Sequence, residues 1–226
     1  MNTTSKRKVQ ENLVWIPTGS VKLEGNLVIP ESAQGIVLFA HGSGSSRHSP
    51  RNRYVADVLQ SSGLATLLID LLTSEEEAID MRTRHLRFDL GLLASRLVDA
   101  TDWLAKNPDT RHLKVGYFGA STGAGAALLA ATERPESVAA VVSRGGRPDL
   151  AGSALGRVKA PTLLIVGGYD IPVIRMNQDA LALLRVEKAL EIVPGATHLF
   201  EEPGTLEEVA RLATQWFKRY LTGMIE

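Results

Sequence analysis

The sequence predicts an α/β fold in which a mostly parallel sheet is covered by helices on both of its faces. Residues 35–40 are a continuous apolar run and residues 64–69 are almost entirely apolar, as expected for strands that are buried on both sides. Helix-like segments with an apolar stripe alternate with these and with later strand-like runs, which is typical of parallel strands joined by helices. An alternating pattern near the start of the chain adds an antiparallel hairpin.

The hairpin is predicted from residues 12–17 and 21–29, with a turn at Thr18-Gly19-Ser20 between them. Apolar and charged residues alternate in its second strand, so one face of that strand is expected to meet solvent. Strand 35–40 comes next.

A helix then leads to strand 64–69. Ser49 is its predicted N-cap, Pro50 its first residue and Gly63 its C-terminal stop.

The rest of the chain continues this alternation. Ser74-x-x-Glu77 resembles a capping box for a short helix, and Thr205-x-x-Glu208 resembles one for a final helix that ends at Gly223. Apolar residues at helical spacing predict a long helix over about 84–106; they are Leu86, Leu90, Leu93, Leu97, Ala100 and Leu104. The other elements are strands at 113–118, 138–143, 161–167 and 188–193 and helices at 121–133 and about 174–185. Residues 144–160 are too short and glycine-rich for a substantial cap domain, so little or no cap is expected.

The composition excludes several classes of function. The 226 residues carry 25 basic and 25 acidic side chains, and this balance gives no support for nucleic acid or an anionic membrane as a partner. The chain has no cysteine, so it has no disulfide, thiolate metal site or cysteine nucleophile. Residues 1–11 are expected to be a flexible terminus rather than a signal peptide, ahead of a single domain over 12–226. No apolar run reaches the ~18 residues of a membrane span, so we expect a cytoplasmic protein.

One motif points to a specific chemistry. The run Gly119-Ala120-Ser121-Thr122-Gly123 lies between a predicted strand and a predicted helix. G-x-S-x-G in that context is the nucleophile elbow, a sharp turn that exposes the serine hydroxyl and leaves room only for glycine on either side. By itself the motif also fits a glycine-rich helix start that Ser121 caps. The context favours Ser121 as a nucleophile.

A serine nucleophile needs a base and an acid, and both follow in the expected order. Asp170 and His198 each come directly after a predicted strand, at the carboxyl edge of the sheet where ligands bind in α/β folds. Asp170 could instead cap a helix, and Asp149, after the preceding strand, is the alternative acid. His198 is the only histidine after the elbow. The earlier histidines, His48, His85 and His112, fit solvated or structural positions better.

The tetrahedral intermediate of such a reaction needs two N–H donors for its oxyanion. The first is predicted from Thr122 and the second from Ser43, in the His41-Gly42-Ser43-Gly44 loop after strand 35–40. His41 is expected to hold this loop rather than act as the base. A phosphate cradle is the alternative for the loop, but neither a P-loop lysine nor a G-x-G-x-x-G accompanies it.

Arginines near predicted loop ends could bind an anionic part of a substrate. Arg144, which directly follows a buried strand, and Arg47 are the possible substrate-binding residues, although a solvated loop charge is the alternative for each. Glu75-Glu76-Glu77 fits the start of a helix better than a metal site, and no metal-ligand spacing occurs. We therefore expect neither a metal nor another cofactor.

With these residues in hand, the chain resembles the α/β-hydrolase superfamily and, within it, the dienelactone-hydrolase-like group. The motifs that carry the resemblance are H-G-S-G at 41–44, R-F-D-L-G-L-L at 87–93, G-A-S-T-G at 119–123, G-G-Y-D at 167–170 and G-A-T-H-L-F at 195–200. Dienelactone hydrolase itself uses a cysteine nucleophile, and this chain has Ser121 in that position. The resemblance implies the fold and a Ser-Asp-His hydrolase mechanism.

The expected activity is hydrolysis of small carboxylic esters or lactones, with water as the second substrate and no cofactor. An acyltransferase, thioesterase or peptidase would use the same three residues. A binding module without catalytic activity is the alternative of a different class.

Overall fold

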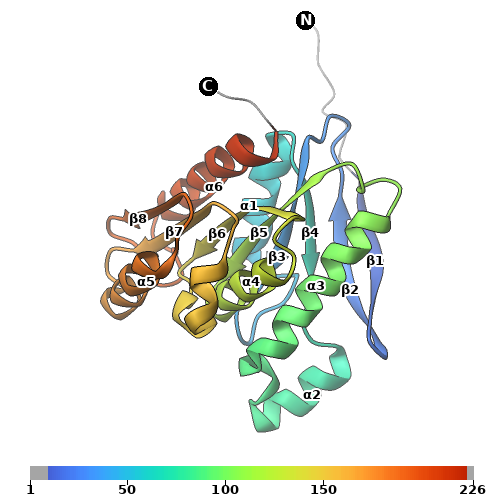
Figure 1. Cartoon of the computed structure of the whole chain (residues 1–226), viewed down its shortest axis with the longest axis horizontal. Coiled ribbons are helices and arrows are strands. Elements are labelled where there is room, and N and C mark those ends of the chain that lie inside the picture. The colour runs from blue at the N-terminus through green and yellow to red at the C-terminus, as the bar shows by residue number, and fades with distance from the viewer. Residues whose placement is uncertain (1–9, 223–226) are drawn as a thin grey trace, which may run out of the picture.

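The computed structural model describes residues 10–222, which form an eight-stranded sheet with helices on both faces (Figure 1). The strand order is β1-β2-β4-β3-β5-β6-β7-β8, and β2 runs antiparallel to its neighbours while the other pairs are parallel. The strands are β1 (Glu11–Thr18), β2 (Val21–Val28), β3 (Gly35–Ala40), β4 (Ala65–Ile69), β5 (Lys114–Ala120), β6 (Val138–Arg144), β7 (Thr162–Gly167) and β8 (Lys188–Val193). The predicted hairpin and mostly parallel sheet are confirmed.

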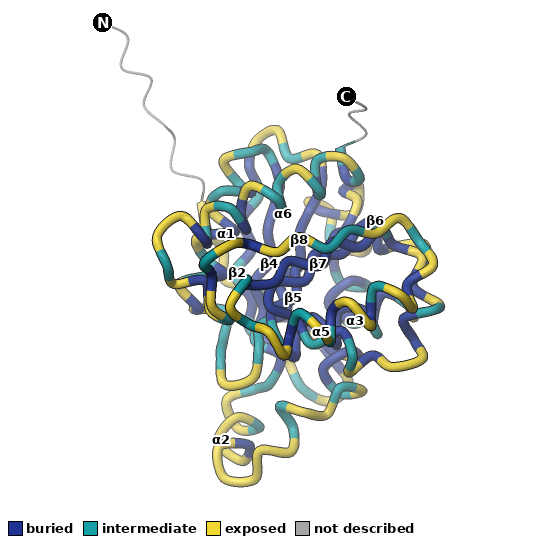
Figure 2. The backbone as a smooth tube through the Cα atoms, turned by 90° about the vertical axis from the view of Figure 1, so that its left-hand side faces the viewer, coloured by how far each residue is buried: buried dark blue, intermediate teal, exposed yellow. Residues whose placement is uncertain are grey.

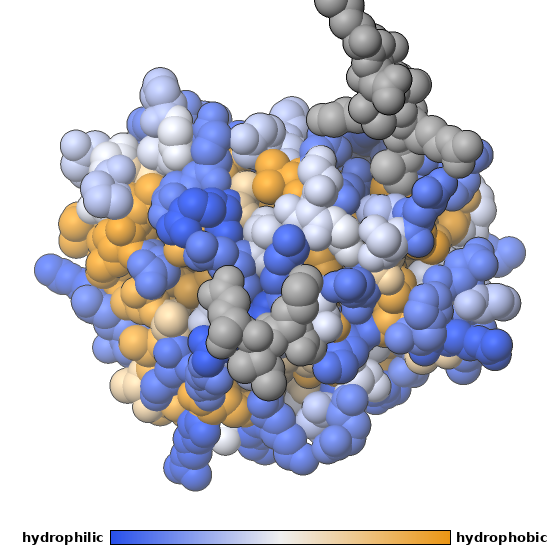
Figure 3. Space-filling model, turned by 90° about the horizontal axis from the view of Figure 1, so that it is seen from above, coloured by the Kyte–Doolittle hydropathy of each residue, from blue (hydrophilic) through white to orange (hydrophobic). Residues whose placement is uncertain are grey.

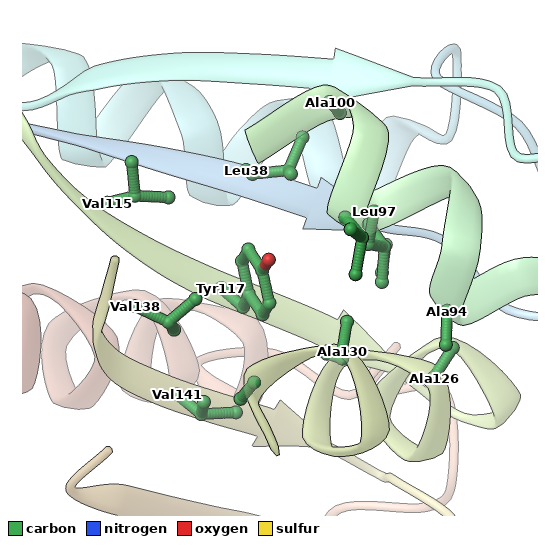
Figure 4. Close-up of a cluster of buried hydrophobic side chains, with 14 of the residues drawn as sticks. Leu38, Ala94, Leu97, Ala100, Val115, Tyr117, Ala126, Ala130, Val138 and Val141 are labelled. Carbon is green, nitrogen blue, oxygen red and sulfur yellow. The ribbon is translucent and has the colours of Figure 1, made fainter. Parts of the chain in front are cut away.

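Helices cover the sheet in two layers. One layer consists of α1 (Pro50–Ser61) and α6 (Thr205–Leu221); the other contains α3 (Leu90–Lys106), α4 (Thr122–Glu133) and α5 (Ile171–Leu183). Successive side chains of a central strand point to opposite faces of the sheet and so pack against different helical layers. Tyr117 packs with α3 and α4 (Figure 4), whereas its neighbour Phe118 packs in the cluster of α1 and α6.

The long predicted helix is wrong at its start, because the chain turns before Leu90. The short helix α2 (Ser74–Thr83) ends at Arg84, which adopts a left-handed conformation with φ of 57°. A single 3₁₀ turn follows at Leu86–Phe88. The Asp89 side chain then accepts a hydrogen bond from the Leu92 N–H and so begins α3 at Leu90.

Two caps also differ from prediction. The capping box of α2 pairs Thr73 with Glu76, one residue earlier than the predicted pair. At α6, Gly204 is the N-cap, and the Thr205 hydroxyl donates to the Glu202 carbonyl instead of capping the helix. A side chain that caps a helix normally belongs to a residue with extended backbone. The cap position of α6 is instead occupied by Gly204, whose φ of 81° is left-handed. The predicted stop at Gly223 lies outside the described residues.

The predicted flexible terminus at residues 1–11 is wrong at Glu11 and is otherwise mostly untested. Residues 1–9 lie outside the described part of the chain, so most of the predicted flexible terminus is not described. Glu11 belongs to β1, where it pairs with Val28. Within residues 10–222, no helix is both long enough and apolar enough to cross a bilayer. Seen from above the view of Figure 1, the surface is largely hydrophilic, with hydrophobic patches scattered over it (Figure 3).

The segment after β6 forms no cap. It folds into a kinked 3₁₀ segment (Pro148–Arg157) that packs on α4, and the next helix starts at Ile171, earlier than expected. The main projection is α2, which follows β4 and extends away from the sheet with most of its residues exposed (Figures 1 and 2). The carboxyl edge of the sheet therefore has a projection beside β4 and no lid from the β6 side.

Candidate active site

Ser121 stands at a strained turn between β5 and α4. Its φ of 50° and ψ of −124° are unusual for a residue other than glycine, and such strain persists only where the surroundings enforce it. A Cβ at Gly119 would lie 2.4 Å from the Ala124 Cα, and one at Gly123 would lie 2.3 Å from the Ala40 carbonyl oxygen. The two glycines thus let α4 turn back against the sheet. The elbow predicted from the sequence is confirmed.

Asp170 and His198 meet at the ends of two neighbouring strands. The His198 Nδ1 lies 2.5 Å from the Asp170 Oδ2. Asp170 directly precedes α5, yet its side chain does not cap that helix and is left for the histidine. A Cβ at Gly167 would lie 2.5 Å from the backbone oxygens of Ala196 and Thr197, so glycine at the end of β7 lets the two loops approach. The structure therefore brings the two predicted residues into contact, and their roles as acid and base stay a prediction.

The alternative acid has a different partner. The Asp149 carboxylate accepts hydrogen bonds from the Arg147 Nε and Nη2, the latter at 2.7 Å. Among the described residues, Asp170 is the carboxylate that contacts His198.

Ser121 reaches the histidine loop through the end of β6. The Ser121 N–H donates to the Arg144 carbonyl at 3.3 Å. Gly145 comes next, and a Cβ there would lie 3.5 Å from the His198 Nδ1 and Cε1. Within residues 10–222 no hydrogen bond joins the Ser121 hydroxyl to His198, and such contacts commonly tighten only when substrate binds. The structure therefore brings the three residues to one edge with the Ser121 hydroxyl still unbonded.

The two predicted oxyanion donors lie side by side. Thr122 is the first residue of α4, and the first N–H groups of a helix have no acceptor within it. The Ser43 hydroxyl lies 2.8 Å from the Thr122 hydroxyl, which ties the loop after β3 to the elbow. A Cβ at Gly42 would lie 3.0 Å from the Ser121 Cβ, so this loop passes directly over the nucleophile. The structure thus brings the two predicted donor residues together beside the elbow, and the role of their N–H groups as an oxyanion hole stays a prediction.

His41 holds the loop in place. Its Nε2 accepts a hydrogen bond from the Leu71 N–H at 3.0 Å, so the neutral ring carries its proton on Nδ1 and donates to the Gly42 carbonyl at 2.9 Å. Burial lowers the pKa of His41, and the neutral form fits both bonds. The structural role predicted for His41 is confirmed.

Sequence reasoning missed a second support for this loop. The Ser43 hydroxyl also lies 3.3 Å from the Arg87 carbonyl, and the Arg87 side chain pairs with Asp80 at the end of α2. Asp80 is buried and also accepts hydrogen bonds from the N–H groups of Leu86 and Arg87. The R-F-D-L run contains Arg87, but only the fold reveals its partners.

The two arginines suggested as substrate ligands have opposite environments. The Arg47 guanidinium is shared among Asp70, Glu24 and Asn26, the last at 2.8 Å from Nε. All three of its nitrogens are therefore held by the protein, which leaves Arg47 a structural cation. Arg144 is 7% exposed, and its Nε and Nη1 are buried without a hydrogen-bond partner.

The remaining candidates lie away from this arrangement. His48, His85 and His112 are exposed, and His85 contacts the Thr83 hydroxyl. Glu75–Glu77 form the first turn of α2, as predicted. No group of residues in the described part of the chain is arranged to hold a metal ion.

A small hollow of about 30 Å³ adjoins the loop after β3 on its α2 side. Its walls include Ser43, Leu72, Arg87 and Leu93, but neither Ser121 nor His198. Large apolar side chains are also exposed on segments at the carboxyl edge of the sheet; they include Phe88, Leu150, Tyr169, Ile171 and Leu199. The surroundings of the triad thus offer apolar surface as well as the hollow.

A sequence model of the dienelactone hydrolase family matches residues 23–222, a span that includes the elbow, Asp170 and His198. The chain belongs to the dienelactone hydrolase family. Membership places it among hydrolases of the α/β-hydrolase fold, and Ser121 stands where this fold carries its nucleophile.

Solved structures give the same result. A crystal structure of a dienelactone hydrolase from Anabaena variabilis is 75% identical, covers 94% of this chain and 99% of that one, and has a TM-score of 0.93. Est1E from Butyrivibrio proteoclasticus has a TM-score of 0.76 at 16% identity, covers 92% of this chain and 98% of that one, and shows a likeness of fold alone.

Two curated relatives carry a different kind of name. Both come from strains of Mycobacterium tuberculosis, are named "Putative phosphoribosyl transferase" and are 61% identical over 215 residues. The match covers 95% of this chain but only 48% of each relative, so the chain spans about half of their length.

Proposed function

We propose that this chain hydrolyses small carboxylic esters or lactones through an acyl-enzyme on Ser121. The observation that carries the proposal is the coincidence of the strained elbow at Ser121 with the 2.5 Å Asp170–His198 contact at the same sheet edge. A serine, a histidine and a carboxylate in this order are the parts that acyl transfer needs.

Proton positions follow from the contacts. The Asp170 carboxylate accepts from His198 Nδ1–H, which leaves the lone pair of Nε2 available as the base. Nε2 takes the proton of Ser121 as its oxygen attacks the carbonyl carbon, and then gives that proton to the leaving alcohol. Asp170 fixes the tautomer and stabilises the imidazolium between these steps.

The negative charge of the tetrahedral intermediate falls on the former carbonyl oxygen. The N–H groups of Thr122 and Ser43 are the donors for it, and one such donor is worth about 3 kcal/mol in the transition state. Water activated by His198 then cleaves the acyl-enzyme and regenerates Ser121. The apolar side chains at the edge of the sheet favour a substrate that is itself largely apolar near the ester.

The names of the mycobacterial relatives mention phosphoribosyl transfer, but we do not propose that activity for this chain. Those proteins are about twice as long as the part that matches this chain. The 215 matched residues make up nearly all of this chain and so include the elbow and both triad partners. The three residues that acyl transfer needs are therefore all present in this chain.

The test is the intact mass of the protein after incubation with a fluorophosphonate, for the wild type and for Ser121→Ala. We expect one adduct on the wild type and none on the variant, followed by hydrolysis of acetyl and butyryl esters in preference to long-chain ones. A folded wild type that forms no adduct would refute the proposal and favour a binding module. An adduct with acyl transfer to an acceptor other than water would assign an acyltransferase instead.

A further inference from the structure

Both backbone groups of the strained nucleophile are bound to one short turn, residues 144–147, at the end of β6. The Ser121 N–H donates to the Arg144 carbonyl at 3.3 Å, and the Ser121 carbonyl accepts from the Arg147 N–H at 3.0 Å. Because Ser121 has φ of 50°, its conformation persists only where neighbouring groups enforce it. The position of this turn therefore helps to set the position of the nucleophile.

The same turn also lies against the proposed base. Gly145 has φ of 49°, and a Cβ on it would lie 3.5 Å from the His198 Nδ1 and Cε1. Gly146, the next residue, has no room for a side chain, since a Cβ there would lie 1.9 Å from the Ser143 Oγ and 2.6 Å from the Ala124 Cβ. The turn thus contacts both the nucleophile and the base, and it is packed tightly against α4.

A buried amide binds the middle of this turn. Asn177 lies in α5 and is fully buried. Its Nδ2 donates to the Gly146 carbonyl at 3.0 Å and to the Val173 carbonyl, one helical turn earlier, at 2.8 Å. Both partners are carbonyl oxygens, so only the donor end of the amide can face them.

The other end of this amide gains nothing from folding. The Asn177 Oδ1 is buried without a hydrogen-bond partner among the described residues, and burial of an unbonded acceptor lowers stability. An apolar side chain would avoid that loss, but it could not bind the turn. The N–H donors are therefore the part of Asn177 that has a use in this fold.

We propose that Asn177 is a positioning residue, which holds the turn 144–147 and through it sets Ser121 relative to His198. This inference rests on the proposed function and adds to it a residue that is buried behind the reacting atoms. A bond to the middle of the turn restrains both of its ends, which bind the backbone of the nucleophile. Since a displacement of about 1 Å costs on the order of 100-fold in rate, a small movement of the turn is sufficient.

The first test measures kcat and KM for acetyl and butyryl esters in Asn177→Ala and Asn177→Asp. We expect kcat to fall by about 10- to 100-fold in both variants with KM unchanged, because only the reacting geometry is altered. Asn177→Asp keeps the size of the side chain but removes its N–H donors, so a role in packing alone would preserve its kcat. Fluorophosphonate labelling of Ser121 should slow by the same factor as kcat.

Thr110→Val is the matched control for a loss of stability alone. Thr110 is also buried, and its hydroxyl donates to the Leu104 carbonyl at 2.8 Å in the loop before β5, at the opposite end of that strand from Ser121. We expect a lower urea midpoint in this variant, with wild-type kcat and KM. Rate constants are expressed per folded protein, from near-UV circular dichroism at the assay temperature. If Asn177→Asp does not fold, Asn177→Ala carries the comparison.

A double-mutant cycle tests whether Asn177 acts through the turn. In Gly146→Ala the new methyl group would lie 1.9 Å from the Ser143 Oγ and would displace the turn at its middle. Substitutions that move the same element are not additive. Adding Asn177→Ala to Gly146→Ala should therefore lower kcat by a much smaller factor than Asn177→Ala does alone.

Several outcomes would overturn the inference. They are wild-type kcat in folded Asn177→Ala or folded Asn177→Asp, an equal loss of kcat in Thr110→Val, a raised KM with unchanged kcat, or losses that multiply in the double variant. In each case ester hydrolysis by the wild type would leave the proposed function intact. A folded wild type with neither a fluorophosphonate adduct nor ester hydrolysis would instead refute the proposed function.

Discussion

The two sides of Ser121 differ in how their charges are matched. On the side of β3 and β4, Arg47 is shared by Glu24 and Asp70, and Asp80 is saturated by Arg87 and nearby N–H groups. On the side of β6 to β8, two charged residues close to Ser121 have fewer partners. Asp170 has one ion-pair contact, with His198, and Arg144 has no recorded bond for two of its nitrogens.

This difference separates structure from chemistry. Groups saturated by protein partners fix the loop after β3, which carries Ser43, one of the two proposed N–H donors. The Asp170 carboxylate, left with one ion-pair partner, is available to orient the histidine that we propose as the base. The matched side thus supplies a rigid frame and the unmatched side supplies the reactive groups.

The largest effect is expected at Asp170. Asp170→Asn should lower kcat for a simple ester by roughly 10⁴-fold, because the amide cannot hold the reactive tautomer of the histidine. Asp149→Asn is the matched control, since its carboxylate pairs with Arg147, and it should retain nearly wild-type kcat. Equal losses in the two variants would mean that the acid is not assigned by the Asp170–His198 contact.

The elbow at Ser121 connects the two sides, and a substitution at Gly123 tests whether its tight geometry is required. In Gly123→Ala the new methyl group would lie 2.3 Å from the Ala40 carbonyl oxygen and would push the loop after β3 away from α4. A displacement of about 1 Å costs on the order of 100-fold in kcat. Gly156→Ala, where the nearest atom is 3.9 Å away, should leave kcat unchanged. Wild-type kcat in Gly123→Ala would contradict a sterically required elbow.

The matched and unmatched arginines should respond oppositely in urea unfolding. Arg47→Met leaves Glu24 and Asp70 without their cation, and should lower the free energy of unfolding by about 1–3 kcal/mol, less than for a fully buried pair. Arg144→Met should show no loss. Lys159→Met, which removes an exposed pair with Glu136, should change stability by at most ~1 kcal/mol. Equal losses in the free energy of unfolding for the two arginine variants would contradict the difference in charge pairing between the two sides of Ser121.

The smallest change in rate is expected from Asp80→Asn. Weaker pairing with Arg87 loosens the support of Ser43, so kcat should fall by about 10-fold, part of the loss of a whole oxyanion donor. Asp109→Asn, an exposed carboxylate before β5, should have no effect on kcat. A wild-type kcat in Asp80→Asn would mean that the Asp80–Arg87 ion pair does not support the loop that carries Ser43.

The same variant predicts a pH dependence of stability. Burial favours the neutral form of Asp80, but hydrogen bonds from Arg87 and Leu86 outweigh it and hold the pKa below its ordinary value. The stabilisation is therefore complete above the unfolded pKa of about 3.9 and is lost as pH falls through the lower folded pKa. Wild-type urea midpoints should fall more steeply below about pH 4 than those of Asp80→Asn. If the urea midpoints of the wild type and Asp80→Asn fell equally with pH, the ionised Asp80 carboxylate would not be the source of this stabilisation.

The sequence alone determined the sheet, the elbow and the order of the triad. Continuous apolar runs mark buried strands, and glycines at 119 and 123 mark a turn that no larger residue fits, so both are local features. The helix over 84–106 was predicted less well, because Arg84 and Asp89 interrupt a pattern whose leucine spacing continues through them.

Only the tertiary structure decided which charges are matched. Glu24, Arg47 and Asp70 are each 23 residues or more from their partners in this cluster, and they meet because β4 lies between β2 and β3 in the sheet. The same sheet order sets Asp170 against His198, 28 residues away, and leaves Asp149 to Arg147. A local pattern cannot encode such pairs, since an ion pair depends on the distance between two side chains in space. For that reason Arg47 and Arg144 looked alike in the sequence, and the fold made one a structural ion and left the other without a partner at two of its nitrogens.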